Sequence, residues 1–377
     1  MRWFYRITFR IFKRRNLEDQ FQDGNQALGS FFSFRTAATF SAACLVIYIF
    51  FRFFQIDWAS ITETLKSVHV GKYFIAFIAY YVSFLFRGMR WKVIAQNASQ
   101  AEEVEVNSPI VTGMTNLRST ALILCGWFVN SLMWFRLGDA YRAYCLGVIS
   151  KLGFPWALGT LVAERLLDMA IVFVAILFSL MMFSSGIQSQ AIQILIIFAT
   201  IITLLLFGLV LLLVYGENRL ISLVPPLAQP YYLKFKTGVL KSFNNIVVIT
   251  GLGLLAWVME CIRMLFVIES LNIEIPIYLI ILASMSNAVL STFPTPGGIG
   301  FVEPGLTGIL LISAVSSDAA SVALLDRSIT YLSILIFGGV AFLFHHIRFI
   351  KELDFRDAAL SSSYRPDIDC GQCEKGR

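Results

Sequence analysis

Charge is scarce in this sequence. Only 14% of its 377 residues are Asp, Glu, Lys or Arg, whereas soluble domains carry about a quarter. Hydrophobic residues make up 57%, and the apolar runs leave too little polar sequence between them for a soluble domain of ordinary size. The composition therefore predicts an all-α polytopic membrane protein without a separate catalytic module, and we expect no enzyme activity.

Signatures of nucleotide, hydrolase and metal chemistry are also missing. The sequence contains no GxxxxGK[ST] loop and no GxSxG elbow. Its three histidines, at positions 69, 345 and 346, cannot assemble a metal triad, and Cys370 with Cys373 forms a lone CxxC without a second pair. We therefore expect neither a metal nor a cofactor, and nothing in the sequence favours binding of nucleic acid.

The first 35 residues form a basic segment. An arginine recurs at every fourth position from Arg2 to Arg14, so on a helix these side chains share one face. Such a helix would lie in the membrane plane on anionic lipid, and a disordered basic tail fits the same composition. We expect residues 36–347 to form a transmembrane domain and residues 348–377 a polar tail.

The first loops follow the positive-inside rule, by which cytoplasmic loops are enriched in Lys and Arg. A first span over 36–54 leads from the basic N-terminus to an outer loop poor in basic residues. A second span over 71–86 then returns to a cytoplasmic loop that contains Arg87, Arg90 and Lys92. The chain would thus begin on the cytoplasmic side.

Two later segments are expected to return to the side from which they enter. If 120–151 crossed the membrane, the basic loop 216–246 would lie outside, whereas a re-entrant hairpin keeps it inside. The segment 276–316 must also return, because its second arm is too short to span. The count is six full spans and two re-entrant hairpins, with both termini cytoplasmic, and eight simple spans remain the alternative. The full spans would be 36–54, 71–86, 154–183, 190–215, 247–268 and 328–345.

The second hairpin contains the stretch "STFPTPGGIGFVEPGL", which is rich in helix breakers. Pro294 and Pro296 would end the incoming helix, and Gly297, Gly298 and Gly300 would permit turns and close approach. Irregular backbone at membrane depth is tolerated only where protein buries it or where it lines a wet cavity. We therefore expect these five residues to act as a hinge or loop beside a ligand cavity.

The two hairpins and the helices that follow them look like copies of one unit. Asp139 corresponds to Glu303, and the dyad Glu164-Arg165 corresponds to Asp326-Arg327, at offsets of 164 and 162 residues. Because three full spans separate the hairpins, the copies would be inverted relative to each other. Inverted repeats of this kind are typical of transporters whose site lies between broken helices at the membrane midplane.

Ionisable residues within the apolar segments are the candidate binding residues, because such residues are expensive in lipid and usually functional. The arginines would bind a phosphate group, and the carboxylates would bind an amino group or carry a proton. For Glu164, Arg165 and Asp168, a structural salt bridge and snorkelling to the interface are the alternative, whereas a functional role is favoured for Glu303 on its Gly/Pro loop. The candidates are Arg136, Asp139, Arg142, Glu164, Arg165, Asp168, Glu303, Asp326 and Arg327.

Five further residues in these segments are interpreted separately. Glu260 and Arg263 add to a set of charges that is nearly balanced in sign. Asn130 and Asn287 lie midway along the incoming arms, where an asparagine is more often an interhelical hydrogen-bond partner than a ligand. Trp257 is taken as apolar bulk.

Three motifs resemble a known family. They are "PTPGGIGFVE", "N(x)5R(x)GD(x)2R" at 130–142 and "ER(x)2D" at 164–168. Together they resemble the flippase-like family typified by the transmembrane region of lysylphosphatidylglycerol synthases, over roughly residues 36–347. The resemblance implies an integral membrane protein that handles aminoacylated phosphatidylglycerol, other anionic phospholipids or polyprenyl-phosphate carriers.

Three departures from that family limit the comparison. Trp134 stands where the family often has a proline, Pro304 directly follows Glu303, and only a short tail follows the last span. The synthases carry a large C-terminal domain that attaches the amino acid, so we do not expect aminoacyl transfer.

The sequence therefore predicts a lipid translocator of the cell membrane. Its partners would be lipids with anionic headgroups, and it could form a homo-oligomer. A membrane assembly factor or a lipid-binding receptor is the alternative, since fold does not fix function. An intramembrane transferase that uses Glu303 or Asp326 as a base is the third.

Overall fold

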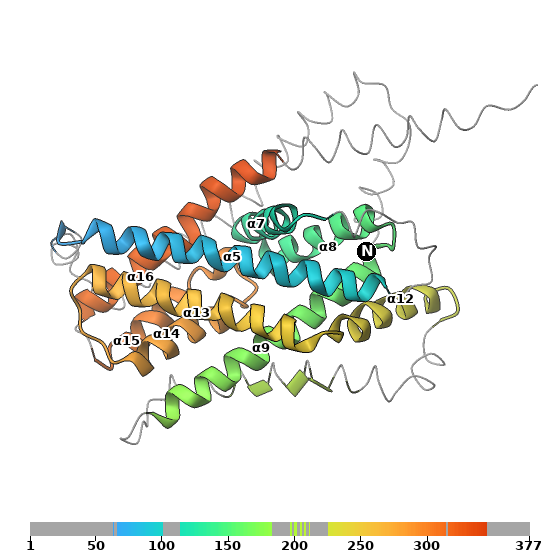
Figure 1. The fold of residues 1–377 in the computed structure, drawn as a ribbon. Helices are drawn as coiled ribbons and strands as arrows, with labels where there is room; N and C mark the ends of the chain where they lie inside the picture. Colours follow the sequence, from blue (N-terminus) through green and yellow to red (C-terminus); the bar gives the residue numbers. More distant parts are fainter. Residues whose placement is uncertain are drawn as a thin grey trace, which may run out of the picture. The chain divides into compact units, whose positions relative to one another are not determined.

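A computed structural model of the chain describes residues 66–100, 114–182, 225–313 and 316–344, together with single positions at 63 and between 197 and 211. The regular elements of these residues are all helical (Figure 1). The elements are α5 (Val70–Ser99), α7 (Asn116–Leu132), η1 (Trp134–Arg136), α8 (Leu137–Ser150), α9 (Phe154–Met181), α12 (Gln229–Leu240), η2 (Lys241–Phe243), α13 (Ile246–Ser270), α14 (Ile277–Leu290), η3 (Pro296–Gly298), α15 (Val302–Leu310), α16 (Ser316–Arg327), η4 (Ser328–Leu332) and η5 (Ile334–Gly338).

Three of the described helices are long and apolar enough to cross a membrane. They are Val70–Ser99, Ile246–Ser270 and Asp318–Phe344, the last of which continues α16 through η4 and η5. The all-helical membrane class predicted from composition is therefore confirmed. The structure does not describe the predicted span 36–54 or the two terminal segments, 1–35 and 348–377. It describes the predicted span 190–215 only at single positions.

One predicted boundary is wrong. Helix α5 does not end at residue 86 but runs to Ser99. Arg87 and Arg90 therefore lie within the helix and not in a cytoplasmic loop, and their side chains are buried, with exposed fractions of 4% and 0%. Gly88 does not break the helix. A side chain there would meet the backbone of Thr120, so the glycine instead lets α7 approach α5 closely.

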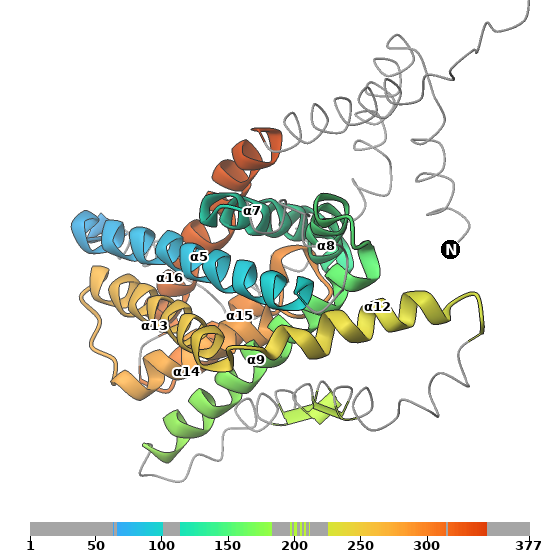
Figure 2. The same ribbon diagram turned by 45° about the vertical axis from the view of Figure 1, so that its right-hand side comes forward.

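Helices α5 and α13 run side by side in opposite directions (Figures 1 and 2). At one end the backbone N–H of His69 donates to the carbonyl oxygen of Ser270 at 2.8 Å. Towards the other end Arg87 meets Glu260, with Nη2 and Oε1 3.2 Å apart. Early residues of α5 thus face late residues of α13, which makes the pair antiparallel.

The first hairpin consists of α7 and α8. Helix α7 ends at Leu132, and the chain then turns at Phe135 and Arg136, whose φ angles of 58° and 52° are left-handed. The arms are joined near this turn, because Asn130 Oδ1 accepts a hydrogen bond from the backbone N–H of Gly138 at 2.8 Å. This contact agrees with the structural role predicted for Asn130.

The second hairpin consists of α14 and α15. Helix α14 ends at Leu290 and α15 begins at Val302, so the stretch rich in proline and glycine interrupts the helices as predicted. Gly297, Gly298 and Gly300 have φ angles of 57°, 73° and 84°, which L side chains rarely adopt. The interruption is therefore built from residues that the backbone conformation requires.

Replacement of Gly138 by alanine is expected to open the first hairpin. A methyl group there would meet the carbonyl oxygen of Gly126 and the Asn130 backbone, neither of which can move without distorting a helix. We expect Gly138→Ala to lower the free energy of unfolding by about 1–3 kcal/mol, as for other overpacked sites. The matched control is Gly251→Ala in α13, where no atom lies within 4 Å and no loss is expected. Unfolding in detergent measures both, and equal stabilities would contradict the close contact.

Candidate functional site

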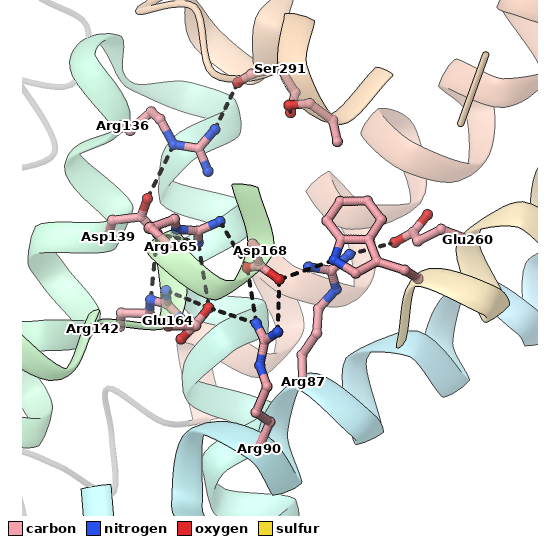
Figure 3. Close-up of polar contacts among 12 residues, drawn as sticks. Arg87, Arg90, Arg136, Asp139, Arg142, Glu164, Arg165, Asp168, Glu260 and Ser291 are labelled. Atoms are coloured by element: carbon pink, nitrogen blue, oxygen red, sulfur yellow. Dashed lines mark hydrogen bonds and ion pairs between the residues drawn. The ribbon is translucent and has the colours of Figure 1, made fainter. Parts of the chain in front are cut away.

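The tips of the two hairpins touch each other. The backbone N–H of Phe135 donates to the carbonyl oxygen of Pro294 at 3.2 Å, and Arg136 Nη1 donates to the carbonyl oxygen of Ser291 at 2.8 Å (Figure 3). Beside this contact, the Tyr331 hydroxyl of η4 donates to the carbonyl oxygen of Ser131 in α7 at 3.2 Å. The two irregular segments, far apart in sequence, therefore form one contact.

A cavity lies beside this contact. It encloses about 880 Å³ that no atom occupies, part of it open to the surroundings. Its lining comes from α5, α7, α9, α13, α14, both hairpin breaks and the helix that continues α16. Two carboxylates, Asp168 and Glu260, and five arginines contribute to the lining, namely Arg87, Arg136, Arg165, Arg263 and Arg327.

Asp139 lies at the start of α8 and is shared by three arginines. Its carboxylate oxygens are 3.1 Å from Arg136 Nε, 3.4 Å from Arg142 Nε and 3.3 Å from Arg165 Nη2 (Figure 3). The acidic group sits in the first turn of the helix, where the helix dipole also favours negative charge. Asp139 thus holds the turn of the first hairpin against α9.

Glu164 and Asp168 of α9 share Arg90 of α5. The Arg90 guanidinium donates two hydrogen bonds to Asp168, at 2.8 and 2.9 Å, in a bidentate pair that Figure 3 shows between the two helices. Glu164 Oε1 lies 3.1 Å from Arg142 Nη2 and 3.7 Å from Arg90 Nη2. Asp168 also accepts a hydrogen bond from the indole N–H of Trp257 at 3.1 Å.

The second hairpin carries an equivalent set. Arg327 pairs with Glu303, with Nε and Oε1 2.7 Å apart, and its Nη1 donates to the carbonyl oxygen of Gly297 at 3.1 Å. Glu303 Oε2 accepts a hydrogen bond from the backbone N–H of Gly300 at 2.7 Å. Asp326 forms an ion pair with Arg263 and accepts from Asn287 Nδ2 at 3.1 Å.

Glu260 connects the charges of α5 and α13. Its carboxylate oxygens lie 3.2 Å from Arg87 Nη2 and 3.0 Å from Arg263 Nε. Arg87 in turn lies over the ring of Trp257, 4.7 Å from its centroid, and 5.8 Å from that of Trp127. Cation–π contacts of this kind strengthen when the site is desolvated. The two central helices are therefore joined by charge as well as by apolar packing.

The nine candidate residues fall into two groups. Arg136, Asp139 and Arg142 join Glu164, Arg165 and Asp168 around the first hairpin, whereas Glu303, Asp326 and Arg327 surround the second. Asp139 and Glu303 belong to different groups and are held by different arginines. Of the nine, Arg136, Arg165, Asp168 and Arg327 line the cavity.

Three members of the site are not among the candidates predicted from the sequence. Arg87 and Arg90 were assigned to a loop, although their spacing of three residues and the lack of a proline up to Ser99 favour one helix face. Trp257 was taken as apolar bulk, but its indole N–H donates to Asp168. No local signal in the sequence marks that donor role. The structural role predicted for Asn287 agrees with its bond to Asp326.

Ion pairs repeat between the two halves of the chain. In each half the arginine of the dyad binds the acid of the hairpin, Arg165 to Asp139 and Arg327 to Glu303. The acid of each dyad binds an arginine on the helix that precedes the hairpin. These latter pairs are Glu164 with Arg90 and Asp326 with Arg263.

Comparisons with known proteins agree with a membrane protein of this kind. The chain matches the family Lysylphosphatidylglycerol synthase TM region over residues 33–338. It is 28% identical over 233 residues to the UPF0104 membrane protein MJ1078 of Methanocaldococcus jannaschii, a match that covers 60% of this chain and 97% of that protein. A UPF0104 membrane protein of Methanothermobacter thermautotrophicus is 23% identical over 76% of this chain and 87% of its own length.

A third relative is MJ1595 of M. jannaschii, another UPF0104 membrane protein, which is 26% identical over 59% of this chain and 73% of its own length. No solved structure matches the chain significantly. The family fits an integral membrane protein with a lipid-related role. The chain belongs to the family of the lysylphosphatidylglycerol synthase transmembrane region.

Proposed function

We propose that the chain is a lipid translocator that binds an anionic headgroup in the arginine-lined cavity and carries it between the two leaflets. The observation that carries this proposal is the lining of the cavity, where five arginines meet two carboxylates beside the contact of the hairpin tips. A guanidinium group stays charged and binds phosphate through two parallel hydrogen bonds. Anionic phospholipids, aminoacylated phospholipids and polyprenyl-phosphate-linked lipids all present a phosphate group to such a site.

The architecture that we propose is an inverted repeat with two re-entrant hairpins among six full spans. The arms of the hairpins are 17, 14, 14 and 9 residues long, whereas a helix needs about 20 residues, and at least about 17, to cross the hydrocarbon, so three of the four arms are too short to span. The two helices that precede the hairpins, α5 and α13, are antiparallel, as copies of opposite orientation would be. The repeated ion pairs support the same arrangement.

The re-entrant topology predicts which loops reach each side of the membrane. A cysteine introduced at 184–190 is expected to react with an impermeant maleimide added outside, and one introduced at 225–230 is expected to react only after the membrane is opened. Both termini would then be cytoplasmic. The reverse labelling pattern would replace the re-entrant hairpins with complete crossings.

Transport would proceed by alternating access at the cavity. Arg136, Arg165 and Arg327 line the cavity and would bind the phosphate. Asp139 and Glu303 do not line it and would position Arg165 and Arg327 or carry a proton, and Arg142 would position Glu164. The hinge formed by Pro294, Pro296, Gly297, Gly298 and Gly300 would let the hairpin tips part. Because the tips are joined by only a few hydrogen bonds, they can separate without unfolding a helix.

Movement of labelled lipid between leaflets tests the proposal. Vesicles that contain the purified chain are expected to expose a fluorescent phosphatidylglycerol with a short labelled acyl chain to extraction by added albumin faster than vesicles without protein. Glu303→Gln keeps the shape of the side chain but removes the charge that holds Arg327 and should slow this movement about tenfold to hundredfold, as for the loss of a charged hydrogen bond. The control is Lys72→Gln, because the Lys72–Glu269 pair is 41% exposed on both sides.

Three results would contradict parts of the translocation proposal or its control. Equal rates for Glu303→Gln and the parent would remove Glu303 from the mechanism. No lipid movement by the parent chain, with a stable protein partner on purification, would favour the assembly factor instead. A change of more than about twofold in Lys72→Gln would show that exposed charge alone affects the rate.

A further inference from the structure

The charges around the first hairpin do not balance. Four arginines of this group meet three carboxylates, so one positive charge has no counterpart in the group. The arginines are Arg90, Arg136, Arg142 and Arg165, and the carboxylates are Asp139, Glu164 and Asp168. All seven side chains are at most 22% exposed. Arginine cannot lose its proton under these conditions, so the excess charge persists.

The second group of charges does balance, although Glu260 is its one carboxylate in the described lining of the cavity. Three arginines pair with three carboxylates around α13 and the second hairpin, so this group has no net charge. The pairs are Arg87 with Glu260, Arg263 with Asp326 and Arg327 with Glu303. The excess therefore belongs to the first hairpin and cannot be neutralised from the second.

The excess charge faces the cavity. Arg136 and Arg165 line it, whereas Asp139 and Glu164 do not. Arg165 Nε and Arg142 Nη1 are buried and have no hydrogen-bond partner among the described residues. An uncompensated charge at membrane depth is costly unless a counterion joins it. The described lining offers no carboxylate beyond Asp168 and Glu260, which are already paired.

We propose that the site selects a lipid headgroup with a single net negative charge, that is, a phosphodiester without a compensating amine. Such a headgroup neutralises the one excess arginine. A zwitterionic headgroup leaves that charge uncompensated, and a phosphomonoester, with a charge of about −1.5 to −2, overcompensates it. This inference rests on the proposed function, because it concerns the substrate class of the same cavity.

Competition among lipids with identical acyl chains tests the selection. The chain is embedded in bilayer discs that contain equal amounts of phosphatidylglycerol, phosphatidylcholine and phosphatidic acid, and the retained lipids are identified by native mass spectrometry. Phosphatidylglycerol should be retained about tenfold more often than phosphatidylcholine, and also more often than phosphatidic acid. Equal retention of the three lipids, or a preference for phosphatidic acid, would overturn the inference.

A pair of variants separates charge from shape. Arg136→Gln removes the excess charge and should bring the ratio of phosphatidylglycerol to phosphatidylcholine close to one. Arg136→Lys keeps the charge and should keep the preference. Both variants should elute from a size-exclusion column as the parent does, which shows that they are folded. If they then retain the two lipids in the same ratio, charge does not set the selection and the inference fails.

Two further measurements identify the source of the anion and separate this inference from the proposed function. Soluble glycerophosphoglycerol at millimolar concentration should not displace the lipid, and displacement would show that the ligand is a free phosphodiester. Movement of labelled phosphatidylglycerol between leaflets is measured on the same preparation. Selective retention without movement would refute translocation, whereas movement without selectivity would refute only the single-charge preference.

Discussion

Asp168→Ala is expected to lower the free energy of unfolding by about 3–5 kcal/mol, the loss typical of breaking a buried ion pair on one side. The Asp168 carboxylate is 1% exposed and accepts three hydrogen bonds, two from Arg90 and one from Trp257. Its removal leaves the fully buried Arg90 guanidinium with only the 3.7 Å contact to Glu164. The group already carries an excess arginine, so the variant adds a second uncompensated charge.

Equilibrium unfolding in mixed micelles measures this loss. The control is Lys72→Ala, which breaks an ion pair of 3.4 Å that is 41% exposed on both sides, against 2.8 Å for the buried pair of Arg90 with Asp168. Exposed pairs contribute about 0–1 kcal/mol, so the control should stay close to the parent. Similar losses in the two variants would show that burial does not determine the strength of these pairs.

A double variant tests whether the pair itself or the uncompensated charge matters. Replacing both partners by apolar residues, Arg90→Met with Asp168→Leu, removes the buried charges together. Such replacements are often neutral or stabilising, so the double variant should recover much of the loss. Lipid movement should nevertheless stay impaired, because the charge pattern of the cavity is altered. A double variant as unstable as Asp168→Ala would contradict the electrostatic explanation.

Much of the site could be predicted from local sequence patterns. The breakers from Pro294 to Gly300 predict an interruption, because proline removes a backbone donor and glycine permits left-handed φ angles. The two acid-arginine dyads stand out because charge is rare in an apolar segment. Each of these signals lies within a few residues of sequence.

The site residues that the sequence does not predict depend on partners far away in the chain. Arg87 and Arg90 look like loop residues because the positive-inside rule counts basic residues without asking whether a carboxylate neutralises them. The partner of Arg90, Asp168, lies 78 residues away, and the donor role of Trp257 depends on the same carboxylate 89 residues away. The single excess charge follows only from the assignment of each arginine to its acid. The nearly balanced charges of the apolar segments conceal a local imbalance.

The contact between the hairpin tips is expected to be a gate. Alternating access requires the tips to part, and they are now joined through Phe135 with Pro294 and through Arg136 with Ser291. A covalent link between the tips should therefore stop transport without blocking the cavity. Phe135 is 75% exposed and Pro294 is also exposed, so cysteines at these positions are accessible to reagents.

The link can be made in a chain whose native cysteines are replaced. Cys125 and Cys145 are buried and suit alanine, whereas Cys261 is only partly buried. The variant with Phe135→Cys and Pro294→Cys is treated with a short bismaleimide that contains a cleavable disulfide. A single backbone hydrogen bond of 3.2 Å joins the two residues, so cysteines at these positions lie within the span of the reagent. Each single-cysteine variant, treated in the same way, controls for modification alone.

The rate of phosphatidylglycerol movement in vesicles that contain the cross-linked double variant tests the account most directly. We predict that cross-linking lowers the rate to that of protein-free vesicles and that reductive cleavage of the linker restores it. Treatment of each single-cysteine variant with the same reagent should leave its rate unchanged. Unchanged lipid movement while the tips are held together would contradict the gate and, with it, transport through the cavity between the hairpins.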